Sequence, residues 1–143
     1  MACLVASGAQ DNAQDRGYWR AASSAAAAIT GDIAIANNKI TIDYAAFTIA
    51  QIRALKPAEL GAAFGADVNA PGNGFLYRLN VPAERRFLHH NTLCGTEDTQ
   101  WMATYVEGRT LQVAFFSGTN MPVLTLDALE NSMERCDTMT YAR

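Results

Sequence analysis

Residues 100–116 read QWMATYVEGRTLQVAFF, and this stretch decides the fold class. Apolar or aromatic side chains recur at every second position from Trp101 and again from Leu111. The Glu107-Gly108 pair between the two runs is a tight-turn sequence. A period of two places alternate side chains on opposite faces of a strand, so the stretch predicts a β-hairpin.

The same alternation recurs toward both ends of the chain. Isoleucines alternate on both sides of the turn pair Asn37-Asn38, which predicts a second hairpin across residues 29–44. Helical spacing predicts one helix, Pro57–Phe64, and a short helical turn within residues 127–135. Further strands are expected at residues 47–51, 75–81, 123–126 and 138–141.

Seven or eight short strands with one or two short helices predict an all-β domain. A parallel α/β sheet needs a helix between successive strands, and the sequence does not provide them. A closed barrel also removes exposed strand edges. We therefore expect a small antiparallel meandering β-barrel of lipocalin- or avidin-like architecture, with a β-sandwich as the alternative.

Size, composition and charge narrow the class of protein. The chain has 143 residues, of which 50% are hydrophobic and 17% charged, which predicts one globular domain and excludes a disordered chain. The net charge is -3, and no run of like charges is longer than Arg85-Arg86. We expect no nucleic-acid partner and no membrane span, because no segment approaches the ~18 consecutive apolar residues that a span needs.

The amino terminus resembles the end of a signal peptide. Residues 1–9, MACLVASGA, are apolar and small, and they precede a polar stretch. Ser7 and Ala9 stand where a signal peptidase requires small residues, which predicts cleavage before Gln10. We divide the chain into a signal-peptide remnant and tail, residues 1–17, and a β domain, residues 18–143. We therefore expect a periplasmic or secreted protein. The alternative is that the amino-terminal segment is an ordinary tail.

The cysteines favour export as well. Cys3 lies in the predicted remnant, so Cys94 and Cys136 form the only pair in the domain, and an exported protein would join them in a disulfide. Two free buried thiols in a cytosolic protein are the alternative. His89 and His90 stand beside Cys94 at spacings that match no standard zinc motif, so we expect neither metal nor cofactor.

Several short motifs, in this order, carry a resemblance to a group of small secreted bacterial proteins to which no activity is assigned. The motifs are Thr30-Gly31-Asp32-Ile33, Leu76-Tyr77-Arg78, Leu93-Cys94-Gly95, Trp101, Leu111, Phe115-Phe116-Ser117-Gly118, Cys136 and Tyr141. The resemblance covers residues 25–143. It implies export and the disulfide, and it implies no catalytic residue.

The rival class is an enzyme, an uncharacterised hydrolase, but the residues themselves provide no complete catalytic site. Ser117 lies in a turn sequence without a nucleophile-elbow pattern. Asp32 and Asp43 face each other only if the first hairpin has the matching register, and loop carboxylates are most often solvated. The glycines of residues 72–74 are not followed by the Lys-Ser or Lys-Thr of a phosphate-binding loop.

A binding protein is therefore the expected class. Barrel mouths are frequent ligand sites, and the candidate residues for a small apolar ligand are Tyr77, Trp101, Tyr105 and Phe116. The alternative for these aromatic residues is ordinary core. A second function is inhibition of a partner, such as a lysozyme or a protease, through loop 66–74 or loop 85–90. The candidate partner-binding residues are Arg85, Arg86, His89 and His90.

Overall fold

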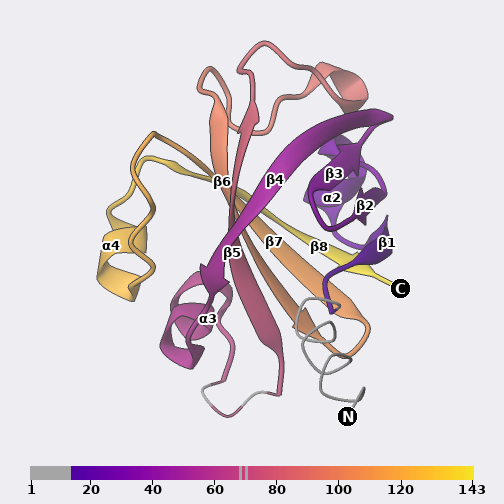
Figure 1. The fold of residues 1–143 in the computed structure, drawn as a ribbon. Helices are drawn as coiled ribbons and strands as arrows, with labels where there is room; N and C mark the ends of the chain where they lie inside the picture. The colour runs from indigo at the N-terminus through magenta and orange to yellow at the C-terminus, as the bar shows by residue number, and fades with distance from the viewer. Residues whose placement is uncertain (1–13, 68, 70) are drawn as a thin grey trace.

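The computed structural model describes residues 14–67, 69 and 71–143. Within these residues, eight strands form one closed antiparallel barrel in which the last strand pairs with the first (Figure 1). The strands are β1 (Gly17–Ala21), β2 (Ile33–Ile35), β3 (Lys39–Ile42), β4 (Ala45–Ala54), β5 (Asn73–Val81), β6 (Thr99–Glu107), β7 (Thr110–Ser117) and β8 (Arg135–Ala142). The predicted meandering barrel is confirmed, and the pairing of β1 with β8 excludes the sandwich.

The register of β6 and β7 separates two sets of buried side chains. Met102 pairs with Phe115, and both belong to the cluster that fills the barrel interior. Trp101 pairs with Phe116, and both belong to a second cluster on the outer face. Because successive residues point to opposite faces, β6 and β7 are buried on both faces.

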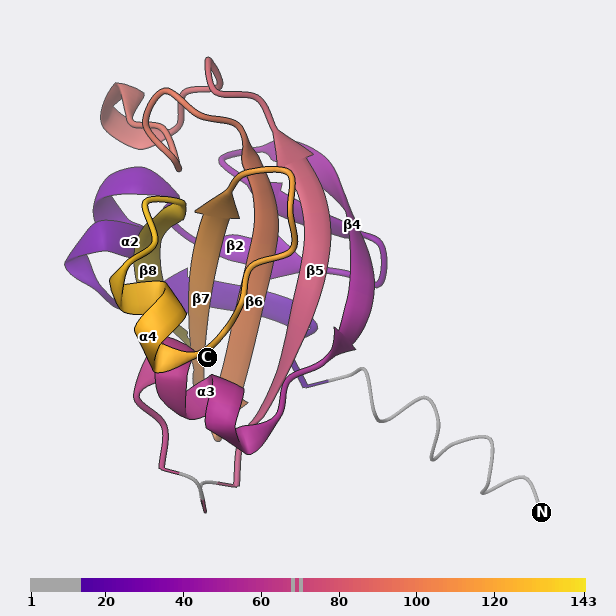
Figure 2. The ribbon, with the colours of Figure 1, turned by 90° about the vertical axis from the view of Figure 1, so that its left-hand side faces the viewer.

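Two helices cover this outer face (Figure 2). α3 (Pro57–Phe64) has the predicted bounds and ends at Gly65, whose φ of 70° is left-handed. α4 (Leu126–Glu130) lies in the connection between β7 and β8. Leu60 of α3 and Leu129 of α4 are buried in the outer cluster. No helix in the described parts of the chain is long and apolar enough to cross a bilayer.

Two strand predictions were wrong. The first hairpin begins at Ile33 instead of Ile29, because residues 24–29 form the helix α2 (Ser24–Ile29). The Ser23 side chain caps this helix by accepting from the amide of Ala26 at 3.2 Å, and alanine is the best helix former. No strand forms at residues 123–126 either, where Leu124 packs into the outer cluster.

The barrel also begins earlier than predicted. Tyr18 and Trp19, which precede the first predicted hairpin, lie in β1. Trp19 is fully buried inside the barrel, and the Asp15 side chain is buried as well. The boundary at residue 17 therefore falls within a segment that contacts the barrel. Cys3 and the predicted cleavage site before Gln10 lie outside the described residues.

Candidate functional site

Side chains pack the interior of the barrel, where we predicted a ligand. Tyr77 is among them, and its side chain is completely buried. Eight-stranded barrels are just wide enough for interior side chains to fill them. The fully buried members of this inner cluster are Trp19, Ala26, Ile40, Ile42, Tyr77, Met102, Leu111, Val113, Phe115, Met139 and Tyr141.

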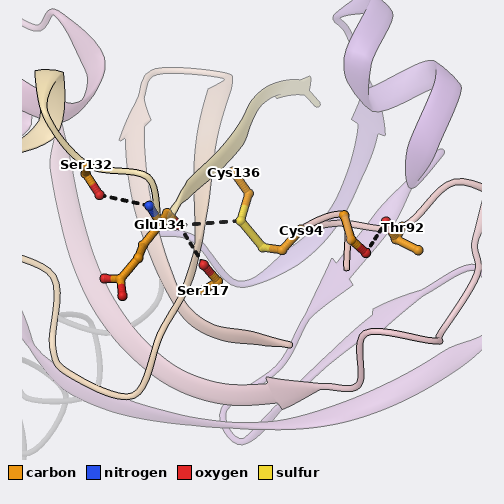
Figure 3. The surroundings of a disulfide bond; sticks show 7 residues. Thr92, Cys94, Ser117, Ser132, Glu134 and Cys136 are labelled. Atoms are coloured by element: carbon orange, nitrogen blue, oxygen red, sulfur yellow. Dashed lines mark hydrogen bonds between the residues drawn. A yellow bond between two sulfur atoms is a disulfide. The ribbon is translucent and has the colours of Figure 1, made fainter. Parts of the chain in front are cut away.

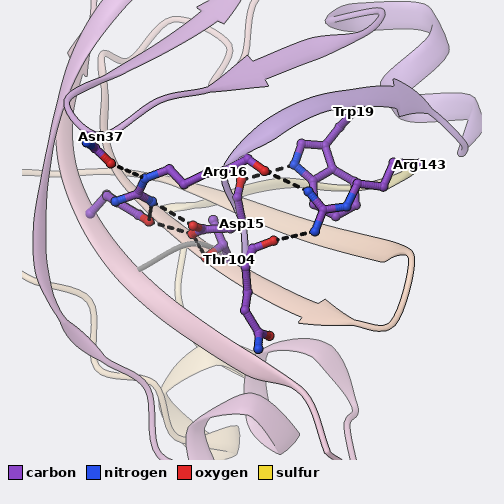
Figure 4. A network of polar contacts seen from close by, with 8 residues as sticks. Asp15, Arg16, Trp19, Asn37, Thr104 and Arg143 are labelled. Atoms are coloured by element: carbon purple, nitrogen blue, oxygen red, sulfur yellow. Dashed lines mark hydrogen bonds and ion pairs between the residues drawn. The ribbon is translucent and has the colours of Figure 1, made fainter. Parts of the chain in front are cut away.

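The Tyr77 hydroxyl takes part in a polar network that closes one end of the barrel (Figure 4). It donates to Oδ2 of Asp15 at 2.5 Å, and the Thr104 hydroxyl donates to the same oxygen at 2.9 Å. Arg16 donates to Oδ1 of Asp15 at 2.7 Å and to the Tyr77 hydroxyl at 2.8 Å. The network satisfies the buried carboxylate, so these residues have a structural role in closing the barrel.

The burial of two interior tyrosines implies that the stability of the fold falls at alkaline pH. Burial and the Asp15 carboxylate raise the pKa of Tyr77, and burial raises the pKa of Tyr141, whose hydroxyl lies 2.7 Å from Oγ1 of Thr30. Unfolded tyrosines ionise near about pH 10, so above that value the unfolded chain binds fewer protons than the folded one.

We therefore expect stability to be unaffected by these groups below about pH 10 and to fall as the pH rises further. Urea denaturation at several alkaline pH values checks this. The Tyr141→Phe variant should lose less stability between about pH 9 and about pH 11 than the unaltered protein. An equal loss would contradict the prediction.

The other three predicted ligand residues lie on the outer face, not in the interior. Trp101 is buried at 6% exposure, but it points away from the barrel axis. Tyr105 stacks on Phe64 of α3 with ring centroids 5.8 Å apart, and Phe116 is buried nearby. Tyr77 is thus separated from the other three by the sheet, and the four do not line one pocket.

The predicted partner-binding residues come together in the loop between β5 and β6, residues 82–98, which contains the short 3-10 helix η1 (Leu88–His90). The Arg85 guanidinium lies over the rings of Phe47 and Phe87, 5.9 and 5.7 Å from their centroids. Phe87 is itself only 5% exposed and anchors the loop in the inner cluster.

The other charged side chains of this loop are exposed, and they include the carboxylates of Glu84, Glu97 and Asp98. Arg86, His89 and His90 are exposed and have no polar side-chain partner among the described residues. His89 and His90 also adopt positive φ angles of 55° and 62°, which are unfavourable for these residues. Residues 85–90 therefore present guanidinium and imidazole groups to solvent on an anchored backbone, while exposed carboxylates lie elsewhere in the same loop.

The predicted disulfide is confirmed and fixes the same loop. Cys94 in the β5–β6 loop is bonded to Cys136 in β8, with Cα atoms 5.1 Å apart (Figure 3). Beside it, the Ser117 hydroxyl donates to the main-chain carbonyl of Glu134 at 3.3 Å. Ser117 therefore has a main-chain acceptor rather than a histidine base. No cluster of three or more His, Cys, Asp or Glu side chains suited to a metal ion occurs among the described residues.

A surface groove on the outer face of β1 to β3 was not predicted from the sequence. Its volume is about 330 Å³. Asp32 and Asp43 both line it, because Ile33 of β2 pairs with Ile42 of β3 and the next positions outward are these carboxylates. The register that was left open therefore brings the two acids to one groove. The lining residues are Tyr18, Thr30, Gly31, Asp32, Ile33, Ala34, Thr41, Asp43, Tyr44 and Leu88.

Comparison of the chain with protein-family models, with curated proteins and with solved structures gives no match.

Proposed function

We propose that this is an exported, non-enzymatic binding protein that engages an acidic surface of a partner protein through its β5–β6 loop. The observation that supports this most strongly is the outward presentation of Arg86, His89 and His90 on a loop anchored by Phe87 and the disulfide. Unpaired charges on a constrained loop suit recognition better than they suit folding.

The anchoring favours affinity. A loop that is already ordered loses less conformational entropy when it binds, so more of its contact energy appears as affinity. Arginine is enriched among the residues that dominate binding energy at interfaces. Glycosidases carry a pair of carboxylates in their clefts, to which the guanidinium groups of Arg85 and Arg86 are complementary in charge. Inhibition of an enzyme of this kind, such as a lysozyme, is the form of the proposal that we favour.

Two features support export. The disulfide is of the kind that persists in oxidising compartments, and residues 1–9 resemble the end of a signal peptide. A periplasmic or secreted location follows as part of the proposal. Mass spectrometry of the protein from its own host tests it, because export predicts an amino terminus near Gln10.

The first expectation, a small apolar ligand inside the barrel, receives less support. A ligand needs interior space, and the interior aromatic residues are packed against one another. Native mass spectrometry of the protein from its host separates the alternatives. A stoichiometric protein favours the proposal, whereas a lipid-like mass would favour the apolar ligand. Turnover of an ester, glycoside or peptide that is lost in Ser117→Ala would contradict the non-enzymatic proposal.

We expect the Arg86→Glu variant to bind its partner at least about tenfold more weakly, because reversal of one exposed charge at an interface removes an attraction and adds a repulsion. Arg109→Glu is the matched control, since it changes net charge equally but lies in the turn between β6 and β7 at the other end of the barrel. Lysozyme and trypsin inhibition assays, together with cross-linking in the host, provide the measurements. Equal binding by both variants would exclude the β5–β6 loop as the contact surface.

A further inference from the structure

We propose that the groove on the outer face of β1 to β3 binds an organic cation, an ammonium or guanidinium group. Leu88 of η1 also lines this groove, but none of Arg85, Arg86, His89 and His90 is among its lining residues, and the groove has the opposite charge preference. The cation belongs either to a lysine or arginine side chain of a polypeptide or to a small free molecule, and both sources share the chemistry that the groove recognises.

The shape of the groove follows from one small residue. Ala34 of β2 pairs with Tyr18 of β1 on one side and with Thr41 of β3 on the other. All three point outward, so the alanine forms a floor between two larger side chains. The volume of about 330 Å³ is at the lower end of the range for small-molecule sites.

The conformation and exposure of Tyr44 bring no benefit to folding. It forms, with Asp43, the two-residue turn between β3 and β4, where φ is 49° at Asp43 and 67° at Tyr44. Turns of this type favour Asn-Gly, and a bulky aromatic residue at positive φ is strained. The Tyr44 side chain is 100% exposed, so no burial offsets the strain. A large apolar ring held in solvent at a position that suits glycine points to contact with a ligand.

Tyr18 supplies a second aromatic side chain to the groove and is 60% exposed. Its hydroxyl donates to Oδ2 of Asp32 at 2.6 Å, while the Ala21 amide donates to Oδ1 at 2.9 Å. These hydrogen bonds, with a smaller contribution from Arg20, hold the pKa of Asp32 below its usual range. The carboxylate is therefore charged and fixed in position at neutral pH.

The polar groups of the groove favour a ligand that donates hydrogen bonds. Ionised carboxylates only accept hydrogen bonds, whereas ammonium and guanidinium groups only donate them. No Lys, Arg or His is among the residues that line the groove. Aromatic faces also attract cations, so Asp32 and Asp43 together with Tyr18 and Tyr44 form a complementary set. A neighbouring groove shares Tyr18 with this one but has the opposite charge, because Arg20, Arg109 and Arg143 line it.

Titration followed by amide chemical shifts tests the proposal, with N-acetyl-arginine amide, N-acetyl-lysine amide and the neutral isostere N-acetyl-citrulline amide as probes. We expect millimolar binding of the cationic probes, with shifts confined to β1, β2, β3, residues 30–32, the turn at Asp43 and Leu88, and no binding of citrulline. Equal binding of citrulline or of methyl glucoside, or no shifts with any cationic probe, would overturn the proposal.

Two variants make the test specific. Asp43→Asn removes one charge and keeps a residue that tolerates positive φ, and Tyr44→Gly removes the ring and relieves the strain. We expect each to weaken cation binding at least fivefold. Met133→Ala, at another fully exposed side chain, is the control and should bind as the unaltered protein does.

Tyr44→Gly also separates binding from folding. We expect its thermal midpoint to rise by about 2 °C or more, because glycine fits the turn better than tyrosine. A more stable variant that binds less cannot owe its loss of binding to unfolding. Unchanged affinity in Tyr44→Gly would remove the aromatic part of the proposal.

A peptide with one central arginine between glycines distinguishes the two sources of the cation. Tighter binding of the peptide than of the capped amino acid identifies a polypeptide partner, and tighter binding of the capped amino acid identifies a small free cation. Failure of this site leaves the proposed partner contact at the β5–β6 loop intact, because Arg86→Glu and Tyr44→Gly alter different surfaces.

Discussion

Replacement of both Cys94 and Cys136 by alanine is expected to lower the free energy of unfolding by about 4 kcal/mol. The bond joins residues separated by 42 positions, and a cross-link of that span removes many conformations from the unfolded chain. Domains of this size are stable by only about 5 to 15 kcal/mol, so the loss is a large fraction of the total. Urea denaturation of the oxidised protein and of the double variant measures it.

Two controls accompany this measurement. Reduction of the unaltered protein should produce nearly the same loss as the double variant, because both remove the cross-link. Cys3→Ala should leave the unfolding midpoint unchanged, since the bond remains. A loss below about 1 kcal/mol on reduction would mean that the unfolded chain gains little freedom from the open bond.

The same bond connects stability to the proposed function. Cys94 holds the β5–β6 loop against β8, and Arg86 and His90 stand on the same loop. If the loop binds a partner in its observed form, reduction should weaken binding even under conditions where the barrel remains folded. The effect would come from the entropy of a loop that must then be ordered on binding.

The sequence predicted those parts of the fold that local rules determine. Alternation around Trp101 and Leu111 gave the β6–β7 hairpin, and Pro57 and Gly65 marked the ends of α3. Local rules did not predict which face of β6 carries Trp101. It points to the outer face of the sheet, which is buried because α3 and α4 pack on it. When both faces of a strand are apolar, alternation does not reveal which face is inside.

The candidate sites divide in the same way. The residues of the β5–β6 loop are contiguous, so their grouping was visible in the sequence. The groove is assembled from three strands and depends on register, which the sequence left open for Asp32 and Asp43. One signal was available for it: tyrosine at residue 44 follows an aspartate between two β runs, where a turn favours glycine.

Asp15 was missed for a different reason. It lies in a polar stretch, QDNAQDR, that is typical of a tail, and a lone carboxylate there predicts exposure. Its burial depends on Tyr77 and Thr104, which are more than 60 residues away in the sequence. The pairing of β5 with β6 brings the two hydroxyl groups together, and the segment before β1 brings the Asp15 carboxylate to them.

We expect Asp15→Ala to lower the free energy of unfolding by about 3 to 5 kcal/mol, the usual effect of removing one partner from a buried charge network. The Asp15 side chain is 1% exposed and accepts hydrogen bonds from three side chains, so its loss leaves the Tyr77 and Thr104 hydroxyls without an acceptor in the barrel interior. Glu130→Ala, at an exposed carboxylate of α4, is the control and should change stability by less than about 0.5 kcal/mol.

A double-mutant cycle with Tyr77→Phe tests whether the network is the cause. The two changes remove the same hydrogen bond, so their combined loss should be smaller than the sum of the separate losses. A chain that starts at residue 18 should lose at least as much stability as Asp15→Ala, because it lacks both Asp15 and Arg16, whose main-chain carbonyl also accepts from Arg143 at 2.7 Å. If that shortened chain were as stable as the full one, the segment before β1 would be a tail after all, and closure of the barrel end would not contribute to the fold.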